Sequence, residues 1–316
     1  MNPTHKPGAP SDAFSSICAG PLRTDALLLL QGPDSAGFLQ GQTTANFKAV
    51  EALSVLRGAF CDVKGRVIAD FLALVIDENR ILLRVSADLS VSLREHLAKY
   101  LMFSKAELTA LALSPWGILG ADRWEALGAG AATPLGKAMA TEKGWAVDLQ
   151  HGAALWLPNP DEDGIPAGLQ AAADEGFDPA WAHNHIERGE VRVVASTSGR
   201  YLPQDLSYDL AGWVSFDKGC YTGQEIIARL HWRGTAKRRL YRGRVAGHQP
   251  QVGVSLWEAG DTRAVGSIVA VAGDSADCQV LLETTKTQAG GTLRVADTTF
   301  AVSVADTPSF AETETD

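Results

Sequence analysis

The sequence of 316 residues predicts an α+β protein with a small all-β domain at its C-terminal end. Two patterns predict this class. Between residues 25 and 102, several strand-like runs precede one amphipathic helix, which is typical of a mainly antiparallel sheet covered by helices on one face. After Arg239, short β-rich runs alternate with turns that contain Gly or Asp, which indicates a small barrel or sandwich.

The N-terminal elements follow from hydrophobic patterns and turn residues. Strands are predicted over 25–31, 53–60, 67–76 and 81–85. Residues 32–34 predict a turn that starts a short helix ending at Leu39, and residues 62–65 predict a hairpin turn. Leucines recur at every fourth position from Leu89 to Leu101, so we expect an amphipathic helix over 88–102.

The middle of the chain gives weaker signals. Residues 121–178 contain Gly/Ala-rich and Pro-rich stretches, which we interpret as loops between short elements. The pair Asp178-Pro179 then predicts a helix that ends at Gly189. Glu187 falls in its last turn, where a carboxylate faces the negative end of the helix dipole, so it is a candidate for binding a ligand. The C-terminal strands are predicted over 241–246, 251–257, 264–271, 278–283, 292–295 and 299–304.

Composition sets the expected domain boundaries and the class of protein. We expect a disordered lead over 1–20, an α+β region over 21–236, a β-domain over 237–306 and a disordered tail over 307–316. The net charge is −9, and no apolar run approaches the ~20 residues of a membrane span. The four cysteines are far apart and form no Cys-x-x-Cys pair, so we expect a reducing, cytoplasmic location and no metal site.

The octapeptide Lys218–Glu225 is the most informative segment. It places a thiol, a cation and two glycines in a short loop before a predicted helix. The spacing of Thr222 and Glu225 predicts a capping box at the start of that helix. Glycines allow a ligand to approach the backbone closely. Cys220 lies near a lysine and a helix start, which favours the reactive thiolate, so it is a candidate functional thiol.

A basic segment follows this loop. No carboxylate lies between Glu225 and Glu258, whereas Arg and Lys side chains are frequent from Arg229 to Arg244. This pattern favours a polyanionic ligand or partner. The alternative is an ordinary solvated face whose charges are paired elsewhere in the fold.

Several motifs together resemble one known family. They are Lys218–Glu225 followed by Arg233-Gly234, the segment Leu39–Thr43, the hairpin Cys61-Asp62-x-Lys64-Gly65, and Leu202-Pro203-Gln204. The chain resembles the YgfZ family from about residue 25 to residue 305. These are folate-binding proteins related to the T-protein (aminomethyltransferase) of the glycine cleavage system. The resemblance implies two interleaved α+β subdomains and a C-terminal β-barrel around a central channel.

The resemblance also implies a site and a cofactor. The cofactor is tetrahydrofolate or a one-carbon derivative, including polyglutamylated forms. Glu187 matches the position that binds the pteridine edge in T-protein relatives, although His185 replaces the Arg of their pattern. The implied folate-binding residues are Glu187, Lys218, Gly219, Tyr221, Gly223, Gln224, Glu225, Arg229 and Arg233. The implied catalytic residues are Cys220, as the functional thiol, and Asp70.

Asp70 marks a departure from the T-protein pattern. T-proteins use an aspartate of an Asp-Asp pair, and the aligned pair here is Ala69-Asp70. Because one carboxylate is missing, no ordinary turnover is expected, and any turnover would be that of an aminomethyltransferase-like folate enzyme.

The function that the resemblance implies is that of a tetrahydrofolate-binding accessory protein in the assembly or repair of iron–sulfur proteins, with an effect on tRNA modification through such enzymes. The implied partners are iron–sulfur client or assembly proteins, with no membrane, no direct nucleic-acid contact and a monomeric state. Two alternatives stay open: a folate-dependent one-carbon transferase or demethylase, and a tRNA-binding module that uses the basic segment.

Overall fold

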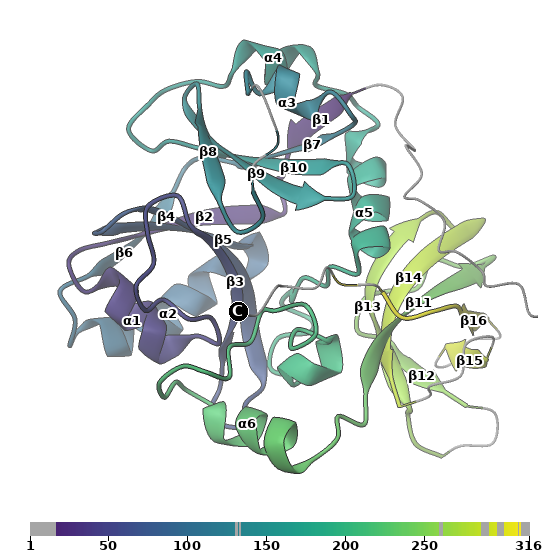
Figure 1. Cartoon of the computed structure of the whole chain (residues 1–316). Coiled ribbons are helices and arrows are strands. Elements are labelled where there is room, and N and C mark those ends of the chain that lie inside the picture. Colours follow the sequence, from purple (N-terminus) through teal and green to yellow (C-terminus); the bar gives the residue numbers. More distant parts are fainter. Residues whose placement is uncertain are drawn as a thin grey trace, which may run out of the picture.

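A computed structural model of the chain describes residues 17–129, 132, 134–258, 262–285, 291–295, 300–308 and 310. These residues form two five-stranded antiparallel sheets and a closed six-stranded barrel (Figure 1). The α+β class with a C-terminal barrel is thereby confirmed. Most of the predicted disordered lead and tail, residues 1–16, 309 and 311–316, lies outside the described residues.

The two sheets are interleaved along the chain. Sheet 1 has the spatial order β1 (Cys18–Pro21), β7 (Trp116–Leu119), β10 (Ala153–Pro158), β9 (Gly144–Gln150) and β8 (Ala138–Thr141). Sheet 2 has the order β3 (Val55–Cys61), β4 (Val67–Asp77), β5 (Arg80–Ser86), β2 (Asp25–Gln31) and β6 (Glu107–Leu111). The chain begins sheet 1, builds all of sheet 2 and then returns to sheet 1, so the two α+β subdomains are interleaved, as predicted.

One hydrophobic core lies between the two sheets. Successive side chains of a strand point to opposite faces, so alternate leucines of β2 and β4, such as Leu27, Leu29 and Leu74, face sheet 1. There they pack with Val147 and Leu155 in the same core cluster. This packing places the edges of both sheets close together, which is where the cavity described below opens.

Short helices cover the outer faces of the sheets. The helices α1 (Ser35–Gln42) and α2 (Ser90–Leu101) lie on sheet 2, and the 3₁₀ turn η1 (Ala87–Leu89) precedes α2 (Figure 1). In α2, Leu93 and Leu97 are buried, as the four-residue period predicts. Leu169 of α4 (Ala167–Ala171) packs on sheet 1, and α3 (Arg123–Ala126) contacts α4.

Three further elements connect the sheets to the barrel. The helix α5 (Phe177–Arg188) contacts β1 as well as barrel strands, and it ends at Gly189 as predicted. The 3₁₀ helix η2 (Pro203–Leu206) contacts β11 and β14 of the barrel. The helix α6 (Gln224–Arg233) lies at the periphery of the molecule (Figure 1).

The barrel closes around its own core. Its strands are β11 (Arg239–Ala246), β14 (Asp277–Thr284), β13 (Gly266–Gly273), β12 (Ser255–Trp257), β15 (Thr292–Val295) and β16 (Ala301–Val304), in that spatial order. The strand predicted over 251–257 is shorter than expected. Its first half forms a turn in which Gly253 has a φ of 91° and approaches Arg200 closely.

Two expectations for the N-terminal and middle regions are corrected. Residues 18–20, expected in the disordered lead, belong to β1, which pairs with β7. The region interpreted as loops over 121–178 contains β8, β9 and β10. The strands β7 and β10 are buried throughout and β8 has only four residues, so they show neither an alternating pattern nor the length that separates a strand from a loop.

Within the described ranges, no helix has the length and apolar character needed to cross a membrane. The four cysteines form no disulfide; Cys61 and Cys278 are buried, and Cys220 is exposed.

Candidate functional site

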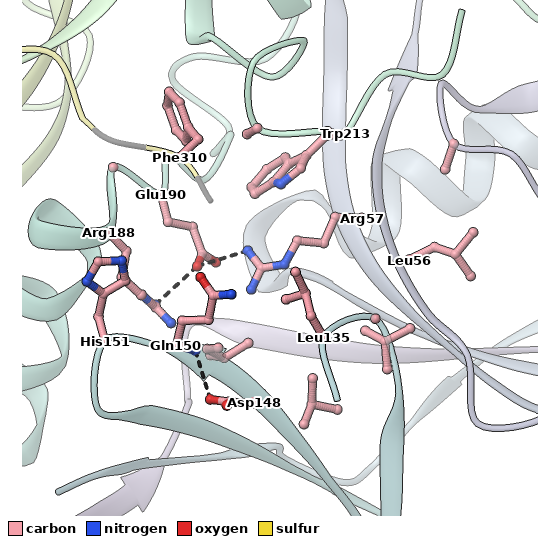
Figure 2. A pocket seen from close by; sticks show the side chains of 18 of the residues that line it. Leu56, Arg57, Leu135, Asp148, Gln150, His151, Arg188, Glu190, Trp213 and Phe310 are labelled. Carbon is pink, nitrogen blue, oxygen red and sulfur yellow. Dashed lines mark hydrogen bonds and ion pairs between the residues drawn. The ribbon is translucent and has the colours of Figure 1, made fainter. Parts of the chain in front are cut away.

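A cavity of about 400 Å³ opens where the two sheets meet the end of α5 and the segment 211–215 (Figure 2). This volume is within the range of small-molecule sites. The side chains of Gln150, His151, Arg57 and Glu190 supply polar groups. The apolar part of the wall consists of Val55, Leu56, Leu135, Val147, Leu149 and Phe310.

Glu190 is the buried carboxylate of the cavity wall. It follows directly after Gly189, which ends α5 in the left-handed conformation with a φ of 64°. One oxygen, Oε2, lies 3.0 Å from Arg57 Nη1 and 3.1 Å from Arg188 Nη2 (Figure 2). Burial by itself raises the pKa of a carboxyl group, but the surrounding cations, Arg188 and Arg57 first, hold the pKa of Glu190 well below its usual range. Glu190 is therefore charged at neutral pH.

Glu190 belongs to a larger buried network of charges. Arg84, in the middle of β5, donates from Nε to Asp25 at 2.5 Å. Arg192 donates to Asp25 at 3.1 Å and to Asp70 at 2.6 Å. Arg84 Nη1 also lies 4.0 Å from Glu190 Oε1 and so joins a network of four arginines (Arg57, Arg84, Arg188 and Arg192) and three carboxylates (Asp25, Asp70 and Glu190). Arginines therefore outnumber carboxylates by one, which favours an acceptor-rich or anionic ligand group.

A second cavity, of about 380 Å³, borders the same network. Trp181 and His185 of α5 and Val269 of β13 contribute to its wall, and Glu190 lines both cavities. Burial lowers the pKa of His185 well below its ordinary value, so this imidazole is neutral. The first cavity also contains Arg57 and Arg188, the two ion-pair partners of Glu190 Oε2, and it opens at the exposed Leu135, so we treat it as the main site.

The turn between β9 and β10 carries strained residues at the cavity wall. Gln150 and His151 have φ values of 64° and 48°, which disfavour residues with a Cβ atom by roughly 1–2 kcal/mol each. Both side chains line the cavity (Figure 2). The His151 carbonyl accepts a hydrogen bond from Asn184 Nδ2 of α5 at 3.0 Å. Strained backbone that neighbouring elements hold in place is a feature of binding sites.

Trp213 fixes the orientation of Arg57. The Arg57 guanidinium lies 5.2 Å from the Trp213 ring centre, a distance typical of a cation–π contact. The ring of Tyr208 packs against Trp213 with 4.4 Å between ring centres, and its hydroxyl donates to the Val191 carbonyl at 3.0 Å. Arg57 is therefore held between an aromatic ring and Glu190, which leaves it little freedom to turn away from the cavity.

Comparison with known proteins identifies the family. No protein-family model matches the chain. It is 30% identical over 265 residues to the tRNA-modifying protein YgfZ of Vibrio vulnificus (strain YJ016), covering 83% of this chain and 80% of that protein. It is also 30% identical over 260 residues to the tRNA-modifying protein YgfZ of Klebsiella pneumoniae (strain 342), covering 78% of each chain. The chain belongs to the YgfZ family.

This YgfZ-family chain shares its fold with a solved aminomethyltransferase. The glycine cleavage system aminomethyltransferase T of Bartonella henselae superimposes with a TM-score of 0.71, covering 94% of this chain and 87% of that one. The sequence identity is 12%, so this likeness shows the shared fold alone. The predicted family and the predicted T-protein-like fold are both confirmed.

The cavity does not contain Glu187, the carboxylate expected to bind the pteridine. The Glu187 side chain is 57% exposed, and its Oε2 lies 3.2 Å from Arg242 Nη1 of the barrel. Glu190, three residues later, lines the cavity instead. The reason is that α5 ends at Arg188, so Glu190 does not continue the helical spacing that places Glu187 on the outer side.

The octapeptide loop does not line the cavity either. Lys218 Nζ donates to the carbonyl oxygens of Thr43 and Ala45 and lies 4.8 Å from the ring centre of Tyr221. Burial lowers the pKa of Lys218 to about 8. Tyr221 is 8% exposed and belongs to the core of sheet 2. Lys218 and Tyr221 thus anchor the loop, whereas Gly219 and Cys220 lie on its exposed side.

The glycines of the loop allow contact between two backbones. Gly223 is the N-cap of α6 with a φ of 84°, and a Cβ atom there would lie 2.4 Å from the Asp62 carbonyl oxygen. The backbone of Gly65 lies on the same side, with its Cα 2.9 Å from that Cβ position. The predicted capping box is absent: no side chain caps α6, and Thr222 Oγ1 instead contacts Gln42 Oε1 at 3.5 Å. The hairpin turn and the octapeptide, two motifs of the family, therefore pack directly on each other.

The remaining predicted residues lie elsewhere. Asp70 is buried in β4, accepts hydrogen bonds from Arg192 Nε and the Val193 amide at 2.6 Å each, and lines neither cavity. Burial raises its pKa, although Arg192 opposes this shift. Gln224, Glu225, Arg229 and Arg233 are all on α6 and do not line the cavity.

The basic segment divides into two groups. Arg238, Arg239 and Arg242 form ion pairs with Glu283, Asp209 and Asp306, respectively. For these three residues the interpretation as internally paired charges is correct. Arg229 and Arg233 are exposed on α6.

Sequence reasoning missed the residues that do line the cavity, although some left a signal. Arg57 of this cavity and Arg84 of the second cavity each interrupt an otherwise apolar strand, a pattern that indicates a charge with a partner. Glu190 directly follows the glycine that ends a helix. Gln150, His151 and Trp213 lie in segments without a clear period, and only the fold brings them to Glu190.

Proposed function

We propose that this chain binds a reduced folate in the cavity beside Glu190 and serves as an accessory protein in the assembly or repair of iron–sulfur proteins, affecting tRNA modification through such enzymes. One observation carries the folate part of the proposal. A single cavity wall combines a charged buried carboxylate, the Arg188 guanidinium with unpaired nitrogens and a broad apolar surface.

The cavity residues fit the groups of a folate. Arg188 Nε and Nη1 are buried without a hydrogen-bond partner, and an acceptor on a bound ligand, such as the pteridine carbonyl, would supply one. The oxygens of Glu190 and Gln150 are suitable acceptors for the amino group and ring N–H of the pteridine. The apolar wall suits the aryl group, and about 400 Å³ accommodates a bicyclic ring with its first substituent.

The accessory role rests on the family. The matched relatives are named tRNA-modifying proteins, and the resemblance implies a role in iron–sulfur protein maturation. Cys220, exposed on an anchored loop, supports this role because its thiol is accessible to a protein partner. Aminomethyl transfer has less support, since Asp70 is held by Arg192 and Val193 outside the cavity.

Calorimetric titration with 5-formyltetrahydrofolate tests the folate site. Leu135 is 57% exposed and lines the cavity, so Leu135→Trp should fill part of the cavity without disturbing the core. The matched control is Met102→Trp, because Met102 is 73% exposed at the end of α2 and does not line the cavity.

We expect one site per chain in the wild type, an affinity at least tenfold lower in Leu135→Trp, or roughly 1.4 kcal/mol, and no change in Met102→Trp. Absence of binding to the wild type would refute the proposal. An equal loss of affinity in both variants would show that folate does not bind in this cavity.

A further inference from the structure

The solvent side of α6 has the composition of a protein-binding face. At about 100° per residue, positions 225, 226, 229, 232 and 233 lie within roughly one third of the helix circumference, and Glu225 is exposed there. Trp232 is 67% exposed and Ile226 is 39% exposed. Arg229 and Arg233 are exposed as well, whereas Ile227 on the opposite side is buried in the core. We call Ile226, Arg229, Trp232 and Arg233 the α6 face.

Two neighbouring segments extend the α6 face. Gly65 of the hairpin turn packs close to Ile226 and Ile227, and the same turn exposes Val63 by 78%. On the other side, Phe216 stacks on His231 with 3.6 Å between ring centres and an angle of 12°. Phe216 begins the loop that carries the exposed Cys220. The thiol is therefore on a loop that packs directly against α6.

Unpaired cations give this surface its charge. Among the residues that the structure describes, Arg229, Arg233, Lys237 and Lys64 have no ion-pair partner, in contrast to Arg238, Arg239 and Arg242. Glu225, in the first turn of α6, is the one carboxylate on this side of the helix, and none follows it in the sequence until Glu258, so the cations outnumber it. A basic surface on a chain with a net charge of −9 selects partners with negative charge.

The composition favours a protein over a nucleic acid. Exposed Trp and Arg are the residues most enriched at the centres of protein interfaces, and the aliphatic side chains of Ile226 and Val63 contribute apolar contact area. RNA binding depends on several phosphate contacts, which a few cations on an acidic chain supply poorly.

We propose that the α6 face docks an acidic protein partner and brings it to the Cys220 loop. That the partner is an iron–sulfur protein rests on the proposed function. The position of the docking surface and the negative charge of its partner are inferred from exposure and charge alone.

Site-specific photo-crosslinking in the cells of origin tests this proposal. The residue p-benzoylphenylalanine replaces Trp232 in the full chain, and the same replacement at the exposed Met102, directly after α2, is the control. Crosslinked adducts are digested with nuclease or protease and identified by mass spectrometry.

The captured protein is then purified, and its affinity is measured for the wild type, for Arg229→Glu/Arg233→Glu and for Arg94→Glu/Lys99→Glu. The last variant makes the same change of net charge on exposed residues of α2.

We expect a protein adduct at position 232 that is absent at position 102. The crosslinked partner should be an acidic protein. Its affinity should fall at least thirtyfold in Arg229→Glu/Arg233→Glu and less than threefold in the α2 variant, and raised salt should weaken it. No adduct specific to position 232, an adduct sensitive to nuclease, a basic partner, or equal loss in both variants would each overturn the proposal. The crosslinking and affinity measurements do not depend on folate binding. If folate titration of the same variants refutes the folate site, these measurements still test the α6 face.

Discussion

Two glutamates three positions apart show how strongly local backbone geometry decides the role of a residue. Glu187 is in the last turn of α5, and its side chain is 57% exposed beside Arg242. Glu190 follows the left-handed Gly189, and its side chain is 5% exposed between Arg57 and Arg188. The surface pair is screened by water, whereas the buried carboxylate compensates the buried Arg188 and the half-buried Arg57.

The first prediction compares these residues. Glu190→Gln should lower the free energy of unfolding by about 3–5 kcal/mol, because it leaves the buried Arg188 and the half-buried Arg57 without their counter-charge. Glu187→Gln should change it by less than about 1 kcal/mol, because an exposed ion pair contributes little. Urea unfolding at neutral pH measures both values. Similar losses in the two variants would show that the network around Glu190 is not essential for stability.

At the scale of secondary-structure elements, the packing of α6 on the hairpin turn explains why the octapeptide has a glycine at position 223. The N-cap Gly223 has a positive φ and faces the Asp62 carbonyl oxygen and the Gly65 backbone. No Cβ atom fits between these segments. Gly219 in the same loop has open space where a Cβ would be, so the two glycines have different requirements.

The second prediction uses this difference. Gly223→Ala should destabilise the protein by roughly 2 kcal/mol or more, because the new Cβ would lie 2.4 Å from the Asp62 oxygen and the backbone conformation is strained for alanine. Gly219→Ala should stay within about 0.5 kcal/mol of the wild type. Thermal unfolding followed by circular dichroism measures both. A loss in Gly219→Ala as large as that in Gly223→Ala would contradict the assigned contact.

A chain of buried polar groups connects the barrel to the rest of the molecule. The Tyr201 hydroxyl and Ser267 Oγ are 2.7 Å apart, and Ser267 Oγ donates to Glu283 at 2.8 Å. Arg238 Nη1 lies 3.0 Å from both Glu283 oxygens. Burial raises the pKa of Glu283 to about 7 even though Arg238 opposes the shift. Glu283 therefore titrates near physiological pH at the junction of the barrel and the α+β region.

The third prediction is a pH dependence of stability. The folded pKa of Glu283 exceeds its ordinary value of 4.5, so its contribution to stability is complete below about pH 4.5 and is lost as the pH rises through about 7. Between pH 5.5 and 8, the unfolding free energy of the wild type should fall by roughly 2 kcal/mol more than that of Glu283→Gln. Urea titrations at several pH values measure this difference. Parallel pH profiles for the two proteins would contradict it.

By itself, the sequence determined the α+β class, the C-terminal barrel, the helices α2 and α5 and the family. These follow from short-range patterns, such as the leucines of α2 and the Asp-Pro start and glycine end of α5, and from motifs that can be recognised without coordinates. It also identified the octapeptide as a conspicuous loop, although not the backbone contact that its Gly223 makes.

Only the tertiary structure decided where the cavity lies. Its wall combines β3, the β9–β10 turn, the residues after α5 and Trp213, segments separated by many positions along the chain. The short strands of sheet 1 carry no periodic signal, so the position of Gln150 and His151 could not be inferred. The exposure of Glu187 and the burial of Glu190 depend on where α5 ends against its neighbours. A site built from long-range packing leaves little trace in local sequence patterns, because each of its residues obeys the rules of its own element.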